Sequence, residues 1–359
     1  MTFAEARAQF PVLERFAYLN AGSMGPLSRA SAEAFAGQAA LDVERGRGGK
    51  PYFEQMLALR QGVRERIARL LRTEPDRIAL TMSTTDSVHV VLAGLRLRPD
   101  DEVVTTDSEH PGLLLSLHAS GARIVVAELH GRPAAEARER ILERVGERTR
   151  LLALSHVLWT TGHVLPVAEL KEQTGLPVLV DGAQSAGAIP IEPGALDFYT
   201  VSAQKWLCGP DSLGALYVAE PDALPVGLPT AFGPQSFERD GRFVPRQGAQ
   251  RFDSGWLAVP SLAGLAAALD GAPEWRFERA AEAAERCRLA LAERFEVVTE
   301  PAQGTLVSFR PAGDPAKQVA KAYERGVVIR DLPGTGLLRA SCGYWTSDED
   351  IARLVAAVD

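Results

Sequence analysis

The sequence predicts an α/β protein with a large, mostly parallel sheet and a smaller α+β region toward the C-terminal end. Short apolar runs recur between residues 78 and 218, and most are separated by segments compatible with helices. Near Leu257 the pattern changes, and a long helix rich in Ala, Glu and Arg precedes several short strands. We therefore expect a large domain over 20–256 and a small domain formed by 1–19 and 257–359.

Seven runs rich in aliphatic, β-branched or aromatic residues are expected to form the large sheet. They are Ile78–Met82, Glu102–Thr106, Arg123–Ala127, Leu151–Ser155, Val178–Asp181, Phe198–Ser202 and Ala215–Val218. Helical patterns lie within 28–71 and on Ser87–Leu95, Ala134–Val145 and Val167–Gln173. Because strands alternate with helices, we expect helices on both faces of a largely parallel sheet.

The C-terminal region is expected to alternate short strands with helices. Helices are predicted from Glu274 to Phe295, near Lys317–Arg325 and from Ser347 onward, where Ser347 begins a run with helix-capping chemistry. The predicted strands are Val297–Thr299, Thr305–Arg310, Val327–Ile329 and Leu337–Ser341.

Composition excludes several classes of function. The net charge of the 359 residues is -7, and the absence of a basic block gives no electrostatic case for nucleic acid. No apolar run has transmembrane length, and the N-terminus lacks the apolar core of a signal peptide, so we expect no membrane association. The three cysteines, Cys208, Cys287 and Cys342, are widely spaced, which fits a reducing cytoplasm and no metal site.

The stretch 177–218 places a carboxylate and a lysine at the ends of two predicted strands. Asp181 follows the apolar run 177–180, and Lys205 follows the run 197–201. In open α/β sheets, ligands bind at this edge. Asp181 could instead be a turn or capping residue, and Lys205 could be an ordinary surface lysine. The apolar and Gly-Pro neighbours of Lys205 favour a pocket, where a lysine of lowered pKa can form a Schiff base with an aldehyde.

Pyridoxal phosphate (PLP) would also need phosphate donors and a flat group over its ring. Ser83, Thr84 and Thr85 open a predicted helix, where amides and hydroxyls bind anions, although simple capping is the alternative. Ser202 and Gln204 could add donors. His110 lies before Pro-Gly on a predicted loop after a strand and could cover the ring, although a lone histidine is more often structural.

These residues resemble the class V aminotransferase family of PLP-dependent enzymes. This fold-type-I group includes cysteine desulfurases, isopenicillin-N-epimerase-like proteins and cysteine-conjugate C–S lyases. The resemblance runs from Tyr18-Leu-Asn-Ala-Gly22 to the C-terminal helix, and its most specific parts are Asp181-Gly-Ala-Gln-Ser, Asp197-Phe-Tyr and Ser202-Ala-Gln-Lys-Trp-Leu-Cys-Gly-Pro. It implies PLP as the cofactor and an amino acid as the substrate.

The resemblance also implies roles for individual residues. Lys205 would be the catalytic residue that carries the cofactor, Asp181 would face the ring nitrogen, and His110 would stack on the ring. The further cofactor-binding positions are Thr84, Thr85, Ser202 and Gln204 for the phosphate and Gln184 near the ring hydroxyl. The substrate-binding positions are Arg339, which would grip the carboxylate, with Asn20 and Trp159. A structural ion pair is the alternative role for Arg339.

The chain departs from the family at three places. The stretch 329–336 holds no cysteine, whereas cysteine desulfurases carry a nucleophilic cysteine there, and we expect Cys208 and Cys342 to be structural. Trp159 stands where many relatives have Asn. Trp256 stands where relatives often have a threonine that reaches the phosphate of the neighbouring subunit. The segments around Trp159 and 333–345 look most like the epimerase-like and C–S lyase branch.

Three hypotheses of function follow. The first is a PLP-dependent C–S lyase that acts by β-elimination on cysteine or an S-substituted cysteine, resembling a desulfurase without its persulfide cysteine. The second is an aminotransferase or an amino-acid epimerase or racemase, and the third is a non-catalytic protein that keeps the fold. The resemblance also implies a homodimer with active sites at the interface, to which Trp256 and the loop 228–255 would contribute.

Overall fold

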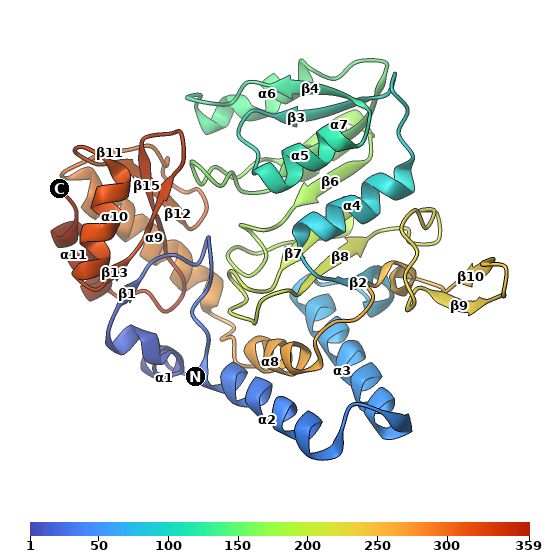
Figure 1. Cartoon of the computed structure of the whole chain (residues 1–359). Coiled ribbons are helices and arrows are strands. Elements are labelled where there is room, and N and C mark those ends of the chain that lie inside the picture. The colour runs from blue at the N-terminus through green and yellow to red at the C-terminus, as the bar shows by residue number, and fades with distance from the viewer.

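The computed structural model describes residues 1–359 and contains a large sheet of seven strands in the order β2-β8-β7-β6-β5-β3-β4 (Figure 1). Strands β3 to β7 are parallel to one another, and β8 is antiparallel to both β7 and β2. The prediction of a mostly parallel sheet is therefore confirmed. The strands are β2 (Ile78–Thr81), β3 (Glu102–Thr106), β4 (Arg123–Ala127), β5 (Thr149–Ser155), β6 (Val178–Asp181), β7 (Phe198–Ser202) and β8 (Gly214–Val218).

Helices cover both faces of this sheet because its strands are apolar on both sides. One face packs on α4 (Thr84–Leu95) and α5 (Pro111–Ala119), whose buried residues join those of the strands in one core cluster. The other face packs on α3, α6, α7 and α8 in a second cluster. Their bounds are α3 (Gly49–Leu70), α6 (Ala137–Leu142), α7 (Val167–Thr174) and α8 (Val259–Asp270).

A second, antiparallel sheet with the order β11-β12-β15-β14 lies beside the large one (Figure 1). Its strands are β11 (Glu296–Val297), β12 (Leu306–Arg310), β14 (Arg330–Leu332) and β15 (Leu337–Ser341). The helices of this region are α9 (Arg276–Ala292), α10 (Pro315–Glu324) and α11 (Asp348–Ala357), and all three contribute to its core cluster or border it.

The N-terminal segment packs against this second region. Strand β1 (Ala17–Tyr18) pairs with β13 (Val327–Val328). Arg7, on α1 (Phe3–Ala8), contacts the buried Asp350 on α11 at 2.6 Å. The chain then crosses to the large sheet and enters α2 (Arg29–Arg45), which packs on α8. The predicted boundaries of the two domains stay a prediction.

Some elements have no strong pattern in the sequence. Helix α8 contains Gly and Pro, and α5 begins with Pro-Gly, which weakens their helical pattern. The hairpin of β9 (Pro234–Phe237) and β10 (Phe243–Pro245) is short and contains a proline in each strand. The stretch before Arg339, for which no strand is predicted between 330 and 336, forms a second hairpin with β15 through β14. Short 3-10 helices lie at Pro11–Glu14, Pro75–Arg77, Ala134–Glu136, Pro193–Ala195 and Ala249–Phe252. None of the helices combines the length and the apolar character needed to cross a membrane.

The crossing segment touches the loop after β7 at Gly25. Its amide donates to the carbonyl of Gln204 at 2.7 Å, and a Cβ added at Gly25 would lie 2.0 Å from the carbonyl oxygen of Lys205. No side chain fits between these two backbones. The close approach therefore requires glycine at this position.

We expect Gly25→Ala to force the two backbones apart and to lower the free energy of unfolding by about 1–3 kcal/mol. Thermal and urea unfolding would measure the loss. Gly37→Ala is the matched control, because Gly37 lies in α2 with no atom within 4 Å of an added Cβ. An equal effect of both substitutions would contradict the close approach.

Candidate active site

The predicted site residues follow strands that end at one edge of the large sheet. Because β8 is antiparallel to both neighbours, β2 runs in the same direction as β3 to β7. The segments after β2, β3, β5, β6 and β7 therefore leave at one edge, where ligands bind in open α/β sheets. They carry Ser83–Thr85, His110, Trp159, Asp181 and Gln204–Lys205.

Lys205 lies half-buried in the turn after β7. Its amine forms neither a hydrogen bond nor an ion pair within the chain, and burial lowers the pKa of Lys205 to about 8. A lysine of ordinary pKa is almost fully protonated at neutral pH and cannot attack an aldehyde. The lowered pKa makes Lys205 the strongest candidate for a nucleophile at this edge.

Asp181 ends β6 and is buried. One carboxylate oxygen, Oδ1, accepts hydrogen bonds from the amide of Ala183 at 2.9 Å and from the hydroxyl of Thr200 at 3.3 Å. The other oxygen, Oδ2, accepts none from the protein. A buried carboxylate with one unused oxygen is suited to a protonated ring nitrogen, because a charge-assisted hydrogen bond compensates its desolvation.

His110 and Trp159 come together from two different loops. Their rings meet edge to face with centroids 5.4 Å apart. The Nδ1 atom of His110 accepts a hydrogen bond from the amide of Gly112 and caps α5, so its proton resides on Nε2 when the ring is neutral. Burial, and then the charge of Lys205, lowers the pKa of His110. Both effects favour the neutral form of the ring, and a neutral aromatic ring would suit the predicted stacking role.

The predicted phosphate donors gather at the start of α4. Ser83 caps this helix through a hydrogen bond from the amide of Asp86 to its hydroxyl. The hydroxyls of Thr84 and Thr85, in the first turn, form no hydrogen bond within the chain. Ser202 donates to the Gln204 side chain at 2.8 Å, which leaves the amide nitrogen of Gln204 free to donate. Free hydroxyls beside helix amides suit a phosphate.

Both the nitrogen and the oxygen of the Gln184 side-chain amide form hydrogen bonds within the protein. Its nitrogen donates to the carbonyl of Gly22 at 2.8 Å, and its oxygen accepts from the Trp206 indole at 3.1 Å. Gln184 therefore ties the N-terminal crossing segment to the loop of Lys205. Its contact with the ring hydroxyl of the cofactor stays a prediction.

Arg339 is fully buried on β15, and it has no carboxylate partner. It donates to the carbonyl of Trp159 at 2.8 Å and reaches the Ser23 hydroxyl at 3.5 Å, while its Nε has no acceptor. Gly22 makes room for it, since a Cβ there would lie 2.7 Å from Arg339 Nη2. A buried cation without a partner is costly, and an incoming carboxylate would compensate that cost.

Arg330 is a second arginine of the site, and the sequence patterns did not indicate it. It lies opposite Arg339 across the β14–β15 pair and donates to the same Ser23 hydroxyl at 3.3 Å. Like charges directly opposite each other destabilise a sheet. Burial, and then this neighbouring charge, lowers the pKa of Arg339 to about 9. Two converging cations favour an anionic ligand, and only the unpredicted strand β14 brings them together.

Asn20 and the cysteines are also placed by the structure. Asn20 pairs through its backbone with Ser341, the last residue of β15, and its side-chain oxygen is buried without a partner. Cys208, Cys287 and Cys342 are all buried and free. Burial raises the pKa of Cys208, and a hydrogen bond with Cys287 followed by burial raises that of Cys342. None of these thiols is an exposed, activated nucleophile.

This arrangement suits one class of protein: an α/β enzyme that would hold an aldehyde cofactor with a lysine, a carboxylate and a turn of free hydroxyls, and a substrate carboxylate with arginines. The chain belongs to the aminotransferase class-V family, whose model matches residues 43–354.

Similar proteins and solved structures support this assignment. The chain is 30% identical to isopenicillin N epimerase of Streptomyces clavuligerus over 99% of its length and 97% of the relative, and 29% identical to the cysteine desulfurase CsdA of Escherichia coli over 99% and 96%. It superposes with a TM-score of 0.90 and 28% identity on a lysine-to-alanine variant of C-DES with glycine covalently linked to PLP, covering 98% of both chains. It also resembles the cystine C–S lyase C-DES in complex with its product cysteine persulfide, with a TM-score of 0.88, 29% identity and coverage of 97% and 98%.

PLP is therefore the cofactor of this protein, and the residues present fit it. Lys205 would hold the aldehyde, the free oxygen of Asp181 would accept the ring N–H, and the turn of Thr84 and Thr85 would hold the phosphate. When bound, PLP supplies an electron sink that stabilises negative charge at the substrate Cα. The protein supplies the orientation of the substrate and a base for its proton.

The lowered pKa of Lys205 predicts how capture of PLP by the cofactor-free protein depends on pH. Because only the neutral amine attacks, the rate should rise with pH, reach half its maximum near the pKa of about 8 and level off above it. The increase from pH 7 to pH 9 should be about tenfold. Stopped-flow absorbance would follow the capture.

Lys205→Ala is the test of residue identity, with the exposed Lys50→Ala as its control. After borohydride reduction, mass spectrometry should find the cofactor on the Lys205 peptide in the parent protein and in the control, and on no peptide of Lys205→Ala. A midpoint near pH 10 in the parent protein would contradict the lowered pKa.

Proposed function

We propose that this enzyme is a C–S lyase that removes the sulfur substituent from Cβ of cysteine or an S-substituted cysteine. The observation that carries this proposal is the hairpin β14–β15, which occupies the stretch before Arg339 and contains no cysteine. With all three thiols buried, the protein offers no acceptor for sulfur. The sulfur would therefore leave as a free small molecule. The likeness to the cystine C–S lyase C-DES supports the same reaction.

Different residues of the chain would carry out different parts of this reaction. Arg339 binds the substrate carboxylate, and Lys205, once released from the cofactor, takes the proton from Cα. The Cβ–S bond then breaks, and its electron pair leaves with the sulfur, which takes up a proton. The sum is an S-substituted cysteine plus water giving a thiol, pyruvate and ammonium. For cystine the released thiol is cysteine persulfide, and no oxidant is needed.

Arg330 favours a sulfur substituent that carries its own acidic group. Arg330 and Arg339 both donate to the Ser23 hydroxyl, so their guanidinium groups lie close together. A single substrate carboxylate forms a two-bond ion pair with only one guanidinium, which leaves the other without an anionic partner. The guanidinium of Arg330 also lies 5.9 Å from the centre of the Trp159 ring. A second carboxylate, such as that of cystine, would complete this half of the site.

An epimerase is the second candidate, because isopenicillin N epimerase is also a relative over nearly the whole chain. Both reactions begin when Lys205 removes the Cα proton. They differ in whether sulfur leaves from Cβ or a proton returns to the other face of Cα. An aminotransferase would instead pass the amino group to the cofactor.

We also propose a homodimer with active sites at the interface. Apolar side chains are exposed around the end of the loop 228–255: Trp256 is 64% exposed and contacts Phe53 and Phe232, and Phe53 is itself 42% exposed. A second copy would bury these side chains. Light scattering should give twice the mass of the chain, and a monomer would contradict this proposal.

The three unpaired cysteines support a cytoplasmic location.

We expect the holoenzyme to release pyruvate and ammonium in equal amounts from cystine or another S-substituted cysteine. Coupled assays would measure both products, and mass spectrometry should find no added sulfur on the three cysteines. Inversion at Cα without pyruvate, seen by chiral chromatography, would favour the epimerase. Conversion of the cofactor to its amine form by a single amino acid would favour an aminotransferase.

The same assay tests the second arginine. Arg330→Ala should lower kcat/KM for cystine by about tenfold or more, and should change it much less for S-methylcysteine, whose substituent has no charge. Arg339→Ala is the comparison and should lower kcat/KM for both substrates. Equal losses for both substrates in Arg330→Ala would contradict the proposed second carboxylate.

A further inference from the structure

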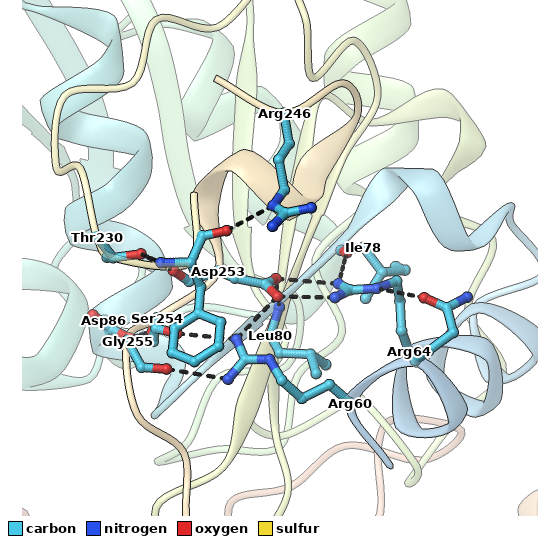
Figure 2. A network of polar contacts seen from close by, with 12 residues as sticks. Arg60, Arg64, Ile78, Leu80, Asp86, Thr230, Arg246, Asp253, Ser254 and Gly255 are labelled. Atoms are coloured by element: carbon cyan, nitrogen blue, oxygen red, sulfur yellow. Dashed lines mark hydrogen bonds and ion pairs between the residues drawn. The ribbon is translucent and has the colours of Figure 1, made fainter. Parts of the chain in front are cut away.

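A buried ionic cluster lies beside the start of α4, outside the site described above (Figure 2). At its centre is Asp253, which is 4% exposed. Its Oδ2 accepts from Arg60 at 3.0 Å and from Arg64 at 2.9 Å. Its Oδ1 accepts from Arg64 at 3.1 Å and from the amide of Leu80, on β2, at 2.8 Å. Both arginines come from α3 and are themselves buried.

The cluster fixes the backbone of residues 253–255 from two sides. Arg60 also donates to the carbonyls of Ser254 and Gly255, at 3.0 and 3.1 Å, and its guanidinium lies 4.4 Å from the centre of the Phe232 ring. The hydroxyl of Thr230 donates to the carbonyl of Asp253 at 2.6 Å. The segment is therefore held rigidly against the end of β2.

Ser254 connects this segment to the turn formed by residues 82–86. Its amide donates to the carbonyl of Leu80 at 2.8 Å, and its hydroxyl donates to Oδ2 of Asp86 at 2.5 Å. The same Asp86 oxygen accepts from the amide of Met82 at 3.0 Å, and the Asp86 amide donates to Ser83. Asp86 thus closes the turn, and Ser254 holds Asp86 in place.

The turn 82–86 contains Thr84 and Thr85, the proposed phosphate donors, whereas Asp253 and Ser254 are not among the predicted cofactor ligands. The contacts run without a gap from α3 through Asp253, Ser254 and Asp86 to this turn. A turn held in its binding geometry before the ligand arrives binds more tightly, because less order is lost on binding.

We propose that Asp253 and Ser254 are positioning residues for the phosphate of PLP, which they serve by holding the turn 82–86 through Asp86. This inference rests on the proposed role of Thr84 and Thr85 in binding that phosphate. It predicts that loss of the Ser254 hydroxyl weakens the hold on the phosphate and leaves the hold on the ring and the aldehyde unchanged.

The test compares PLP with pyridoxal, which has the same ring and aldehyde but no phosphate. Equilibrium dialysis of the loaded enzymes would measure both affinities, and dilution would measure the rate of PLP loss from the holoenzyme. Ser254→Ala should weaken PLP binding about tenfold, as expected for one hydrogen bond to a charged group, and should change pyridoxal binding less than twofold. Ser254→Thr keeps a hydroxyl and should restore the affinity for PLP.

Two further variants make the result decisive. Ser31→Ala is the matched control, since it removes another buried serine hydrogen bond, to the carbonyl of Gly264, far from the turn along the chain. It should leave both affinities unchanged. The double variant Thr84→Val, Thr85→Val is the reference for the phosphate site and should weaken PLP binding selectively.

The outcomes separate the two ideas. If the threonine variant loses PLP selectively but Ser254→Ala does not, the positioning role is wrong and the phosphate site stands. If Ser254→Ala weakens PLP and pyridoxal equally, it acts on general stability, and the positioning role is also wrong. If the threonine variant loses no selectivity for PLP, the proposed phosphate site itself fails, and this inference fails with it.

Discussion

Six of the seven strands of the large sheet run in one direction, and β8 alone is reversed, so the segments after those strands leave at a single edge. The backbone of each inner strand pairs on both sides within the sheet, and its apolar side chains are buried on both faces. The polar residues that follow the strands therefore meet at this edge. Lys205, Asp181, His110 and the turn 82–86 come together for this reason, although up to 122 residues separate them, from Ser83 to Lys205.

The protein treats its buried charges in two different ways. Around Asp253, every charge has a partner, and the cluster clamps α3, β2 and the loop before Trp256. At the edge of the sheet, Lys205 and Arg339 have no carboxylate partner, and one oxygen of Asp181 accepts no hydrogen bond from the protein. Unpaired buried charges destabilise a folded chain, so their concentration in one place marks the position where a charged cofactor and substrate complete the interactions. The paired cluster stabilises the fold around the unpaired one.

In the proposed reaction, the residues around Cβ of the substrate decide the outcome, whereas Lys205 would remove the Cα proton in both the lyase and the epimerase. The hairpin β14–β15 contains no cysteine and brings Arg330 opposite Arg339. The tryptophan at 159 places its ring against His110 and its carbonyl against Arg339. These features support our proposal of a substrate with an acidic sulfur substituent and of a sulfur product that leaves the protein. They lie in the stretch 329–336 and at Trp159, two of the three places where we expect the chain to depart from its relatives.

The sequence by itself determined the strands of the large sheet, the edge that carries the candidate site and the pair Asp181 and Lys205, because buried parallel strands are continuous apolar runs and their polar neighbours stand at the ends. The antiparallel position of β8, the helix α8 and the strand β14 were decided only by the tertiary structure, since short or Gly- and Pro-containing segments have no pattern of their own. The same holds for Arg330 and for the contacts from Asp253 through Ser254 to Asp86. The residues joined by these hydrogen bonds lie 168 or more positions apart in the sequence, and Arg330 faces Arg339 only because a hairpin forms. Only packing in three dimensions brings such atoms within hydrogen-bonding distance.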